Sequence, residues 1–435
     1  MLFASNNLQI QTKKKIFAIG LVSIALTACG GGGGSSSTSS GSGSASGSSG
    51  SGTGSTSGSG STGSGTGSGS GSSPTPASFA YALTSNASGS TIIQQYSVAT
   101  SGALSAVTSP TPIALSFDAQ DVVLKFDPTR KYAYTESWSG SGNGNIVQYS
   151  LGANGVLTPM TPASIATDTV PSDISIDPTG KFVYVSNWGV EANGTTAAIP
   201  STITEYKIGT GGALSLIGKV TLPTTLYAEG ITSTATSVYV TLGNNANVDS
   251  TSISQYVIQA DGTLASSPAS TVNLTHFTKG LMIAANGKYA YAPNYVEGAT
   301  SGSTIYEYSF SASGALVPNG SLTLPATANP FKIAIDANSK YAYVSGVQSN
   351  ISQFIIGTDG KLSAMAVPTI TTSSTPHSII IDPTNKFVYV GDIDNVNVGG
   401  GVNNGITQYS IGSDGSLSQL SFLATAAGIQ GVALN

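Results

Sequence analysis

The sequence predicts an all-β fold, a seven-bladed β-propeller with four-stranded antiparallel blades, and two observations indicate it. A phrase best seen in the run from Pro171 to Asn187 recurs seven times. Each copy holds short runs of β-branched and aromatic residues between Gly, Pro, Asn and Ser. A period near 50 residues made of several short strands is typical of propellers, in which one repeat forms one blade. The second aromatic of a Phe/Tyr-x-Tyr unit marks the copies, 46 to 55 residues apart, at Tyr81, Tyr134, Tyr184, Tyr239, Tyr291, Tyr343 and Tyr389.

Four strands can be assigned within the clearest repeat, over residues 174–176, 182–185, 203–208 and 214–220. The first two are joined by Asp177-Pro178-Thr179-Gly180, where the proline presets a turn angle and the Asp side chain can bond the turn backbone. Similar turns begin at Asp127, Asp336 and Asp382. A carboxylate that recurs at one turn position in several blades indicates turn formation, so these residues are excluded as catalytic candidates.

The two ends of the repeat region are expected to complete a single blade. Phe79-Ala80-Tyr81 matches the second strand of the repeat, whereas residues 430–435 match the first strand. Pairing the C-terminal strand with the N-terminal ones would close the ring and leave no free sheet edge between the first and last blades.

Residues 1–28 are typical of a signal peptide. Lys13-Lys14-Lys15 precedes an apolar run too short to span a bilayer, and small residues follow it. Leu26-Thr27-Ala28-Cys29 resembles a bacterial lipobox, which implies that Cys29 becomes a lipidated N-terminus and anchors the protein to a membrane. Gly30 then resembles the pattern of outer-membrane lipoproteins. The alternative is an ordinary cleaved signal with a stray thiol, since Cys29 is the only cysteine.

Residues 29–73 follow as the lipidated cysteine and a Gly/Ser tether, and residues 74–435 form the predicted propeller. The tether has almost no apolar side chain to bury and should behave as a flexible coil with a reach of roughly 35 to 40 Å. Serine glycosylation of the tether is a less simple interpretation. Charged residues make up 8% of the chain, with a net charge of −5, and nucleic acid is excluded as a partner because phosphate binding needs a concentrated basic surface.

The repeated Ile-x-Ile-Asp-Pro-Thr-Gly-Lys-Phe-Val-Tyr-Val-Ser-Asn phrase and its Tyr-x-Ile-x-x-x-Gly-x-Leu tail resemble the seven-bladed lactonase propellers. These include propeller-type 6-phosphogluconolactonases and carboxymuconate cyclases, and the related YVTN-repeat surface proteins. The resemblance covers about residues 77 to 435 and implies the fold more specifically than the activity. The Gly-Pro-Arg-His-like phrase of the family enzymes is absent, only Pro376-His377-Ser378 is similar to it, and Arg130, the single arginine, is expected on the opposite face.

The starts of the innermost strands are expected to surround one mouth of the central channel. Aligning the repeats on their turns places Val122, Ser172, Glu229, Lys279, Phe331, His377 and Gln430 at one level, with Val123, Asp173, Gly230, Gly280, Lys332, Ser378 and Gly431 next. His377 is the candidate acid or base because imidazole titrates near neutral pH. Glu229, Lys279 and Lys332 are the candidates for positioning an anionic substrate, and Asp173, His276 and Gln430 for binding a ligand. The alternative is a polar rim that is simply hydrated.

Aromatic residues form a second pattern on the same face. Trp138 and Trp188 occupy equivalent positions in adjacent repeats, and Tyr295 occupies that position in a third. Aligned aromatic rings could stack on sugars, although packing over the blade ends is the favoured interpretation.

A metal site is only weakly indicated, in the run Asp392-Ile393-Asp394-Asn395-Val396-Asn397. Val396 stands where an EF-hand would place a ligand, so neither a metal nor another cofactor is predicted. The sequence therefore favours a lipid-anchored cell-envelope propeller that binds a glycan or an envelope protein, without catalysis. The alternative is a divergent lactonase or cycloisomerase with its site at the channel mouth.

Overall fold

The computed structural model describes thirteen segments of the 435-residue chain: 78–85, 91–107, 113–115, 123–138, 142–190, 198–223, 226–243, 251–276, 278–294, 303–325, 328–346, 349–393 and 404–435. The predicted signal peptide, Cys29, the tether, Val122, Tyr295 and residues 394–397 lie outside these described residues. Within the described segments, no helix has the length and apolarity needed to cross a membrane.

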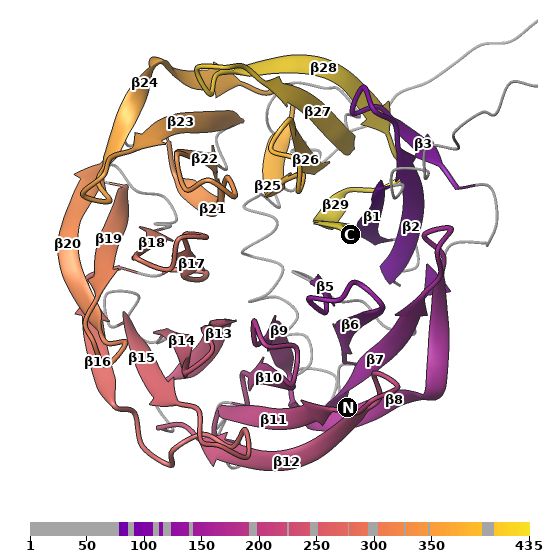
Figure 1. The fold of residues 1–435 in the computed structure, drawn as a ribbon, viewed down its shortest axis with the longest axis vertical. Helices are drawn as coiled ribbons and strands as arrows, with labels where there is room; N and C mark the ends of the chain where they lie inside the picture. The colour runs from indigo at the N-terminus through magenta and orange to yellow at the C-terminus, as the bar shows by residue number, and fades with distance from the viewer. Residues whose placement is uncertain are drawn as a thin grey trace, which may run out of the picture. The chain divides into compact units, whose positions relative to one another are not determined.

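Seven antiparallel sheets form a ring around a central axis (Figure 1), which confirms the predicted all-β seven-bladed propeller. We number the blades in chain order. Blade 1 contains β1 (Ser78–Ser85), β2 (Thr91–Val98), β3 (Leu104–Ala106), the short β4 (Ile113–Ala114) beside β2, and β29 (Ile429–Leu434). Blade 2 contains β5 (Leu124–Phe126), β6 (Tyr132–Ser137), β7 (Asn143–Leu151) and β8 (Leu157–Thr169). Blade 3 contains β9 (Pro171–Ile176), β10 (Phe182–Asn187), β11 (Thr202–Ile208) and β12 (Leu214–Thr221).

The remaining four blades repeat this order from the channel outward. Blade 4 contains β13 (Tyr227–Ser233), β14 (Ser237–Gly243), β15 (Thr251–Val257) and β16 (Ser270–Leu274). Blade 5 contains β17 (Met282–Ile283), β18 (Tyr289–Asn294), β19 (Thr304–Phe310) and β20 (Leu316–Thr323). Blade 6 contains β21 (Pro330–Ile335), β22 (Tyr341–Gly346), β23 (Asn350–Ile356) and β24 (Leu362–Thr371). Blade 7 contains β25 (Thr375–Ile381), β26 (Phe387–Ile393), β27 (Gly405–Ile411) and β28 (Leu417–Ala424).

The ring closes as predicted, because the C-terminal strand β29 is the innermost strand of blade 1. It pairs antiparallel with β1, with Tyr81 opposite Ala433. The side-chain oxygen of Asn435 accepts the N–H of Phe79 at 2.6 Å, and the N–H of Asn435 donates to the carbonyl of Phe79 at 3.1 Å. The last residue thus secures the closing strand from both its side chain and its backbone.

The recurrent aspartates stabilise hairpin turns, as their spacing predicts. One carboxylate oxygen of Asp177 accepts the N–H groups of Lys181 and Phe182, and the other accepts the N–H of Thr179. Asp127, Asp336 and Asp382 make the same set of bonds in blades 2, 6 and 7. These hairpins lie at the end of each blade opposite the predicted mouth.

The marker tyrosines hold neighbouring blades together. Each donates from its buried hydroxyl to a glycine carbonyl in the next blade, in the pairs Tyr81–Gly155, Tyr134–Gly212, Tyr184–Gly262, Tyr239–Gly314, Tyr291–Gly360, Tyr343–Gly415 and Tyr389–Gly102. Glycine is required there: Gly212 has a φ of +81°, and an added Cβ would lie 2.2 Å from the ring of Tyr132. The aromatic pair of one repeat and the Gly-x-Leu tail of the next therefore form one contact between blades, which we call the joint.

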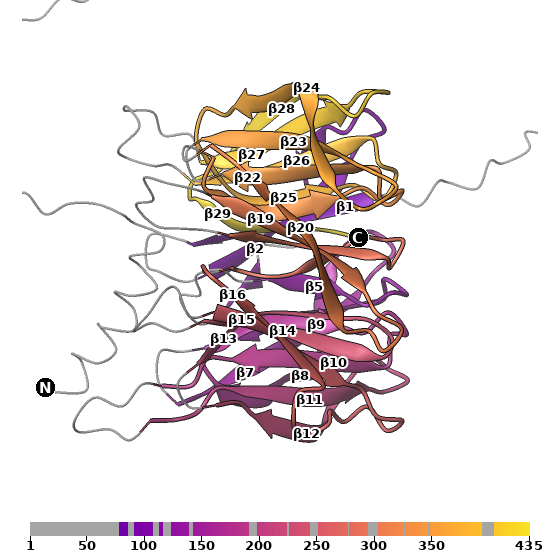
Figure 2. The same cartoon turned by 90° about the vertical axis from the view of Figure 1, so that its left-hand side faces the viewer.

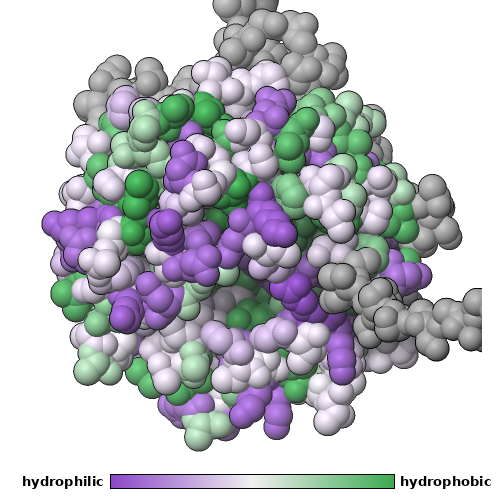
Figure 3. Space-filling model, turned by 45° about the horizontal axis from the view of Figure 1, so that its top comes forward, coloured by the Kyte–Doolittle hydropathy of each residue, from purple (hydrophilic) through white to green (hydrophobic). Residues whose placement is uncertain are grey.

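The hydrophobic core lies between the blades. Among the described residues it forms seven clusters, each drawn from two neighbouring blades, such as Tyr184 and Ile203 of blade 3 with Val238 and Val240 of blade 4. Stability is thus distributed around the ring. The strands run across the thickness of the ring (Figure 2). The face turned to the viewer in Figure 1 is the hairpin end of the blades, and hydrophilic side chains surround a hollow near its middle (Figure 3).

Candidate functional site at the channel mouth

Within the described segments, five inner strands carry a β-bulge near their first residues, at the predicted mouth level. The register shifts fall at Ser172 in β9, Glu229 in β13, Phe331 in β21, His377 in β25 and Gln430 in β29. A bulge leaves one residue outside the ladder and re-aims its side chain, and bulges are frequent beside functional sites. The mouth residues are therefore set apart from the regular sheet by the backbone itself.

A buried ion pair joins blades 4 and 5 at this level. The Nζ atom of Lys279, on the connection before β17, lies 3.7 Å from a carboxylate oxygen of Glu229, and both side chains are only 9% exposed. Little water screens such a pair, so its geometry is strongly held. Lys279 also lies 6.0 Å from the ring centre of Phe331 in blade 6.

The same chain of contacts continues from blade 6 to blade 1. The rings of Phe331 and His377 lie 4.8 Å apart between centres, and Nζ of Lys332 lies 5.7 Å from the Phe331 ring. Nδ1 of His377 lies 3.2 Å from the backbone carbonyl of Gln430. A carbonyl can only accept, so Nδ1 must carry the proton of that bond, and Nε2 is then the basic nitrogen of neutral His377.

The other arc of the mouth is built around Asp173 in blade 3. One of its carboxylate oxygens accepts the N–H of Ile174 at 2.8 Å and lies 3.9 Å from Nζ of Lys125 in blade 2. The other accepts the N–H of Ile231 in blade 4 at 3.1 Å. Ser172 adds a bond from its hydroxyl to the carbonyl of Ala228 at 2.7 Å. Asp173 thus joins three consecutive blades.

Glu136, in β6, belongs to this arc and was missed by the sequence analysis. Its side chain is 4% exposed, and one oxygen accepts the N–H of Val123 at 3.0 Å. Burial, and then the nearby charge of Asp173, raise the pKa of Glu136 to about 8, so the carboxyl is mostly protonated at neutral pH. A signal was available: the equivalent position, two residues after the marker tyrosine, is a hydroxyl residue in three repeats, at Ser186, Thr241 and Ser345, and Glu136 is its only carboxylate.

Comparisons with solved structures identify proteins of similar fold. A protein of Lactobacillus plantarum matches with 17% identity and a TM-score of 0.64 over 82% of this chain and 99% of its own. A proposed 6-phosphogluconolactonase of Bacteroides uniformis matches with 17% identity and a TM-score of 0.63, again over 82% and 99%. The periplasmic gluconolactonase of Pseudomonas aeruginosa matches with 14% identity and a TM-score of 0.63 over 82% and 98%.

The fold is that of the lactonase-type propellers. This confirms the fold that the repeat resemblance implied. No family model and no curated protein matches the chain. At these identities the likeness concerns the fold alone, so the chemistry has to be argued from the mouth residues.

The two tryptophans pack against the protein. Trp138 is 7% exposed, and its indole N–H donates to the carbonyl of Gly142 at 3.0 Å. Trp188 is half-buried with its ring 5.3 Å from that of Tyr227. These contacts agree with packing over blade ends, and sugar stacking on these rings stays a prediction.

His276 and the run that begins at Asp392 are the remaining candidates from the sequence. His276 is half-buried on the connection that follows the outer strand β16, where its backbone carbonyl accepts the hydroxyl of Thr251 at 2.6 Å. Asp392 is fully buried in β26 and accepts the hydroxyl of Thr407. Burial raises the pKa of Asp392 to about 7. Among the described residues, no group of three or more His, Cys, Asp or Glu is arranged to hold a metal ion.

The charges of the mouth favour an anion. Among the described residues of the mouth, three lysines, Lys125, Lys279 and Lys332, accompany the carboxylates of Asp173 and Glu229, while burial raises the pKa of Glu136 to about 8. The described part of the mouth therefore carries a small positive excess in a chain whose net charge is −5. A surface of one sign attracts ligands of the other.

Proposed function

We propose that the channel mouth binds a small anionic molecule and that the protein works as a lipid-anchored binding module of the cell envelope. One observation carries the proposal: an unbroken series of contacts runs from Glu229 through Lys279, Phe331 and His377 to the backbone of Gln430, across five blades. Purely structural residues at the rim would not need an ammonium group, an imidazole and an aromatic ring gathered at one level.

The aromatic face of Phe331 supports a mode of recognition. The ammonium groups of Lys279 and Lys332 lie 6.0 and 5.7 Å from the centre of the Phe331 ring. A carboxylate or phosphate of a ligand could bond both ammonium groups, while a small apolar part of the ligand rests against the ring. Ligands of this class are small organic acids and phosphorylated sugars.

The location of the protein rests on its N-terminal sequence. Residues 1–28, the lipobox-like tetrad ending in Cys29 and the Gly/Ser run support lipid anchoring, with the outer membrane as the proposed site. The tether would hold the propeller clear of the headgroups, where it can meet an envelope glycan or protein. A Cys29→Ser variant should lose palmitate labelling and leave the membrane fraction, and membrane retention of the unlabelled variant would contradict the anchor.

Ligand binding is tested by calorimetric titration of the detergent-solubilised full chain with small mono- and dicarboxylates and sugar phosphates. Lys332→Gln should weaken the best ligand about tenfold. Lys340→Gln is the matched control, because Lys340 also lies over an aromatic ring in blade 6, 4.7 Å from the centre of Tyr341, but at the hairpin end. Equal affinities of both variants and the unaltered protein would contradict the mouth as the binding site.

Lactone hydrolysis is the second candidate, and the tautomer of His377 favours it. Nε2 could take a proton from a water molecule as its oxygen bonds to the lactone carbonyl carbon, and the imidazolium would then return the proton to the ring oxygen as the ester C–O bond breaks. Lys279 and Lys332 would hold an anionic group of the substrate. A muconate-type cycloisomerisation would use the same base.

The two candidates are separated by pH-stat measurements on sugar-acid and carboxymuconate-type lactones. Hydrolysis predicts turnover that His377→Ala abolishes while ligand binding persists. Turnover that does not exceed the buffer rate across the panel, together with Lys332-dependent binding, would leave the binding module as the function.

A further inference from the structure

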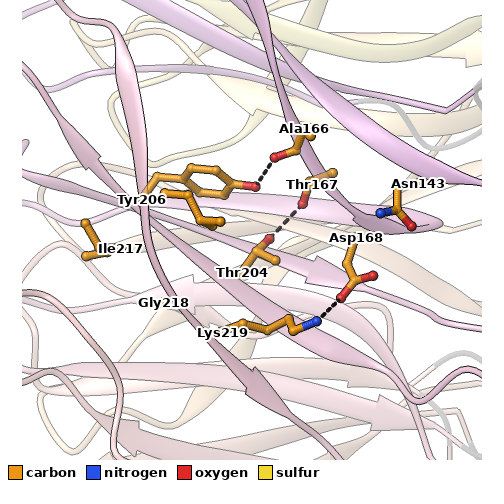
Figure 4. Close-up of a pocket in the computed structure, with 10 residues that line it drawn as sticks. Asn143, Ala166, Thr167, Asp168, Thr204, Tyr206, Ile217, Gly218 and Lys219 are labelled. Carbon is orange, nitrogen blue, oxygen red and sulfur yellow. Dashed lines mark hydrogen bonds and ion pairs between the residues drawn. The ribbon is translucent and has the colours of Figure 1, made fainter.

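A groove of about 370 Å³ lies between blades 2 and 3, on their third and fourth strands and away from the inner strands that form the mouth. It is lined by the end of β8 on one side and by β11 and β12 on the other (Figure 4). Its volume falls at the lower end of the range for small-molecule sites, which begins at roughly 300 Å³. The groove is not part of the repeat pattern, and none of its lining residues belongs to the mouth.

The groove exists because β8 is longer than the other outer strands and crosses toward blade 3. With 13 residues it is the longest strand of the described chain. The hydroxyls of Thr167 and Thr204 bond across the blade interface at 2.7 Å, and the hydroxyl of Tyr206 donates to the carbonyl of Ala166 at 2.7 Å. Gly218 lines the groove through its backbone, because an added Cβ would point the other way, 2.1 Å from the buried carboxylate of Glu205 and 3.4 Å from Thr263 of blade 4.

The two ends of the groove differ in chemistry. At one end Asp168 and Lys219 form an ion pair of 3.1 Å, and the exposed Asn143 lies beside Asp168 (Figure 4). The other end is apolar, with Ile217 and with Leu216, whose residue surface is 59% exposed. The groove thus offers a carboxylate acceptor, an ammonium donor and an amide next to an apolar surface, with no net charge.

We infer that this groove binds a neutral saccharide of one or two rings. Each sugar hydroxyl can both donate and accept, so adjacent hydroxyls can bond Asp168 and Lys219 together without separating their charges. The C–H face of the ring can cover Leu216, which otherwise exposes apolar surface to water. An anionic ligand would compete with Asp168 for Lys219, and a wholly apolar ligand would remove water from the ion pair without replacing its hydrogen bonds.

The test uses the full chain in detergent, with ligand-observed NMR and methyl spectra of the protein recorded with maltose, cellobiose and N,N′-diacetylchitobiose, and with a glucuronic-acid-containing disaccharide for comparison. At least one neutral disaccharide should bind and shift the methyl signals of Leu216 and Ile217. Leu216→Ser and Lys219→Met should each weaken binding about tenfold. The matched control is Leu420→Ser. It makes the same substitution at another exposed leucine, which is 48% exposed and lies on the outer strand β28 of blade 7.

The outcomes separate this groove from the mouth. His377→Ala should leave saccharide binding unchanged, and loss of binding in that variant would overturn the groove as the site. Failure of all three neutral disaccharides to bind at millimolar concentration would also overturn it. So would unchanged binding in both groove variants, or tighter binding of the acidic disaccharide.

Discussion

The hydroxyl of Tyr389 donates a 2.9 Å hydrogen bond to the carbonyl of Gly102 and thereby joins blade 7 to blade 1. The two residues are 287 positions apart in the chain, yet the bond repeats the joint found between all other neighbouring blades. Tyr389 is fully buried, so its hydroxyl is satisfied by this bond rather than by water.

Tyr389→Phe should therefore destabilise the ring by about 1–3 kcal/mol, because the buried carbonyl of Gly102 loses its donor. Denaturant unfolding monitored by fluorescence measures the change. Tyr306→Phe is the control, since Tyr306 bonds Thr275 at an exposed position and should change stability little. Equal losses of unfolding free energy in the two variants would contradict a stabilising role for the bond between Tyr389 and Gly102.

Removal of residues 429–435 should expose the channel side of β1 and make the propeller sensitive to proteases. The deletion takes away the whole innermost strand of blade 1 and its pairing with β1. Asn435→Ala, which removes only the bond to the N–H of Phe79, should remain resistant. Limited proteolysis compares the two, and a resistant truncated chain would refute the closure.

Glu205→Gln should raise stability above neutral pH. Glu205 is buried in β11, where five other blades hold glutamine, and burial raises its pKa to about 7. The fold therefore favours the protonated acid, and the native protein loses stability as the pH rises from the ordinary glutamate range through 7. At pH 8 the variant should be more stable by about 1–3 kcal/mol, and the difference should vanish near pH 4. A difference that did not depend on pH would contradict the shifted pKa.

Glu136→Gln should alter how ligand binding depends on pH. As the pH rises through about 8, Glu136 ionises and the positive excess of the mouth is lost, so the affinity for an anion should fall. The variant cannot ionise and should keep its affinity from pH 7 to 9. Titrations at three pH values measure this, with Glu205→Gln as a control remote from the mouth. Parallel pH profiles for Glu136→Gln and the unaltered protein would show that Glu136 does not act on the ligand.

Much of the fold is visible in the sequence because propeller repeats are local. The Asp177 turn, the strand alternation and the split first blade all follow from patterns within one repeat, and the structure has them as predicted. The joints between blades are less visible. Tyr184 and Gly262 meet only once the blades are stacked, so the pattern marks both residues without indicating that they pair.

The placement of the mouth residues was predicted in outline. Alignment on the turns brought Glu229, Lys279 and His377 to one level, and the structure adds the bulges and contacts that join them. Glu136 was missed because it lies on a second strand and reaches the mouth only through its side chain. The groove was missed because it depends on the length of β8. That length is set by contacts with blade 3, such as the bond between Thr167 and Thr204, and not by the repeat pattern.

The central claim is that the channel mouth is the ligand site, and histidine NMR tests it most directly. The chain has only two histidines, His276 and His377, so ¹⁵N-labelled imidazole signals of the full chain can be assigned with a single His276→Gln variant. Titration with the tightest-binding small carboxylate or sugar phosphate should shift the Nε2 signal of His377 and leave that of His276 in place. A bound ligand that moves neither signal, or that moves only His276, would contradict the account.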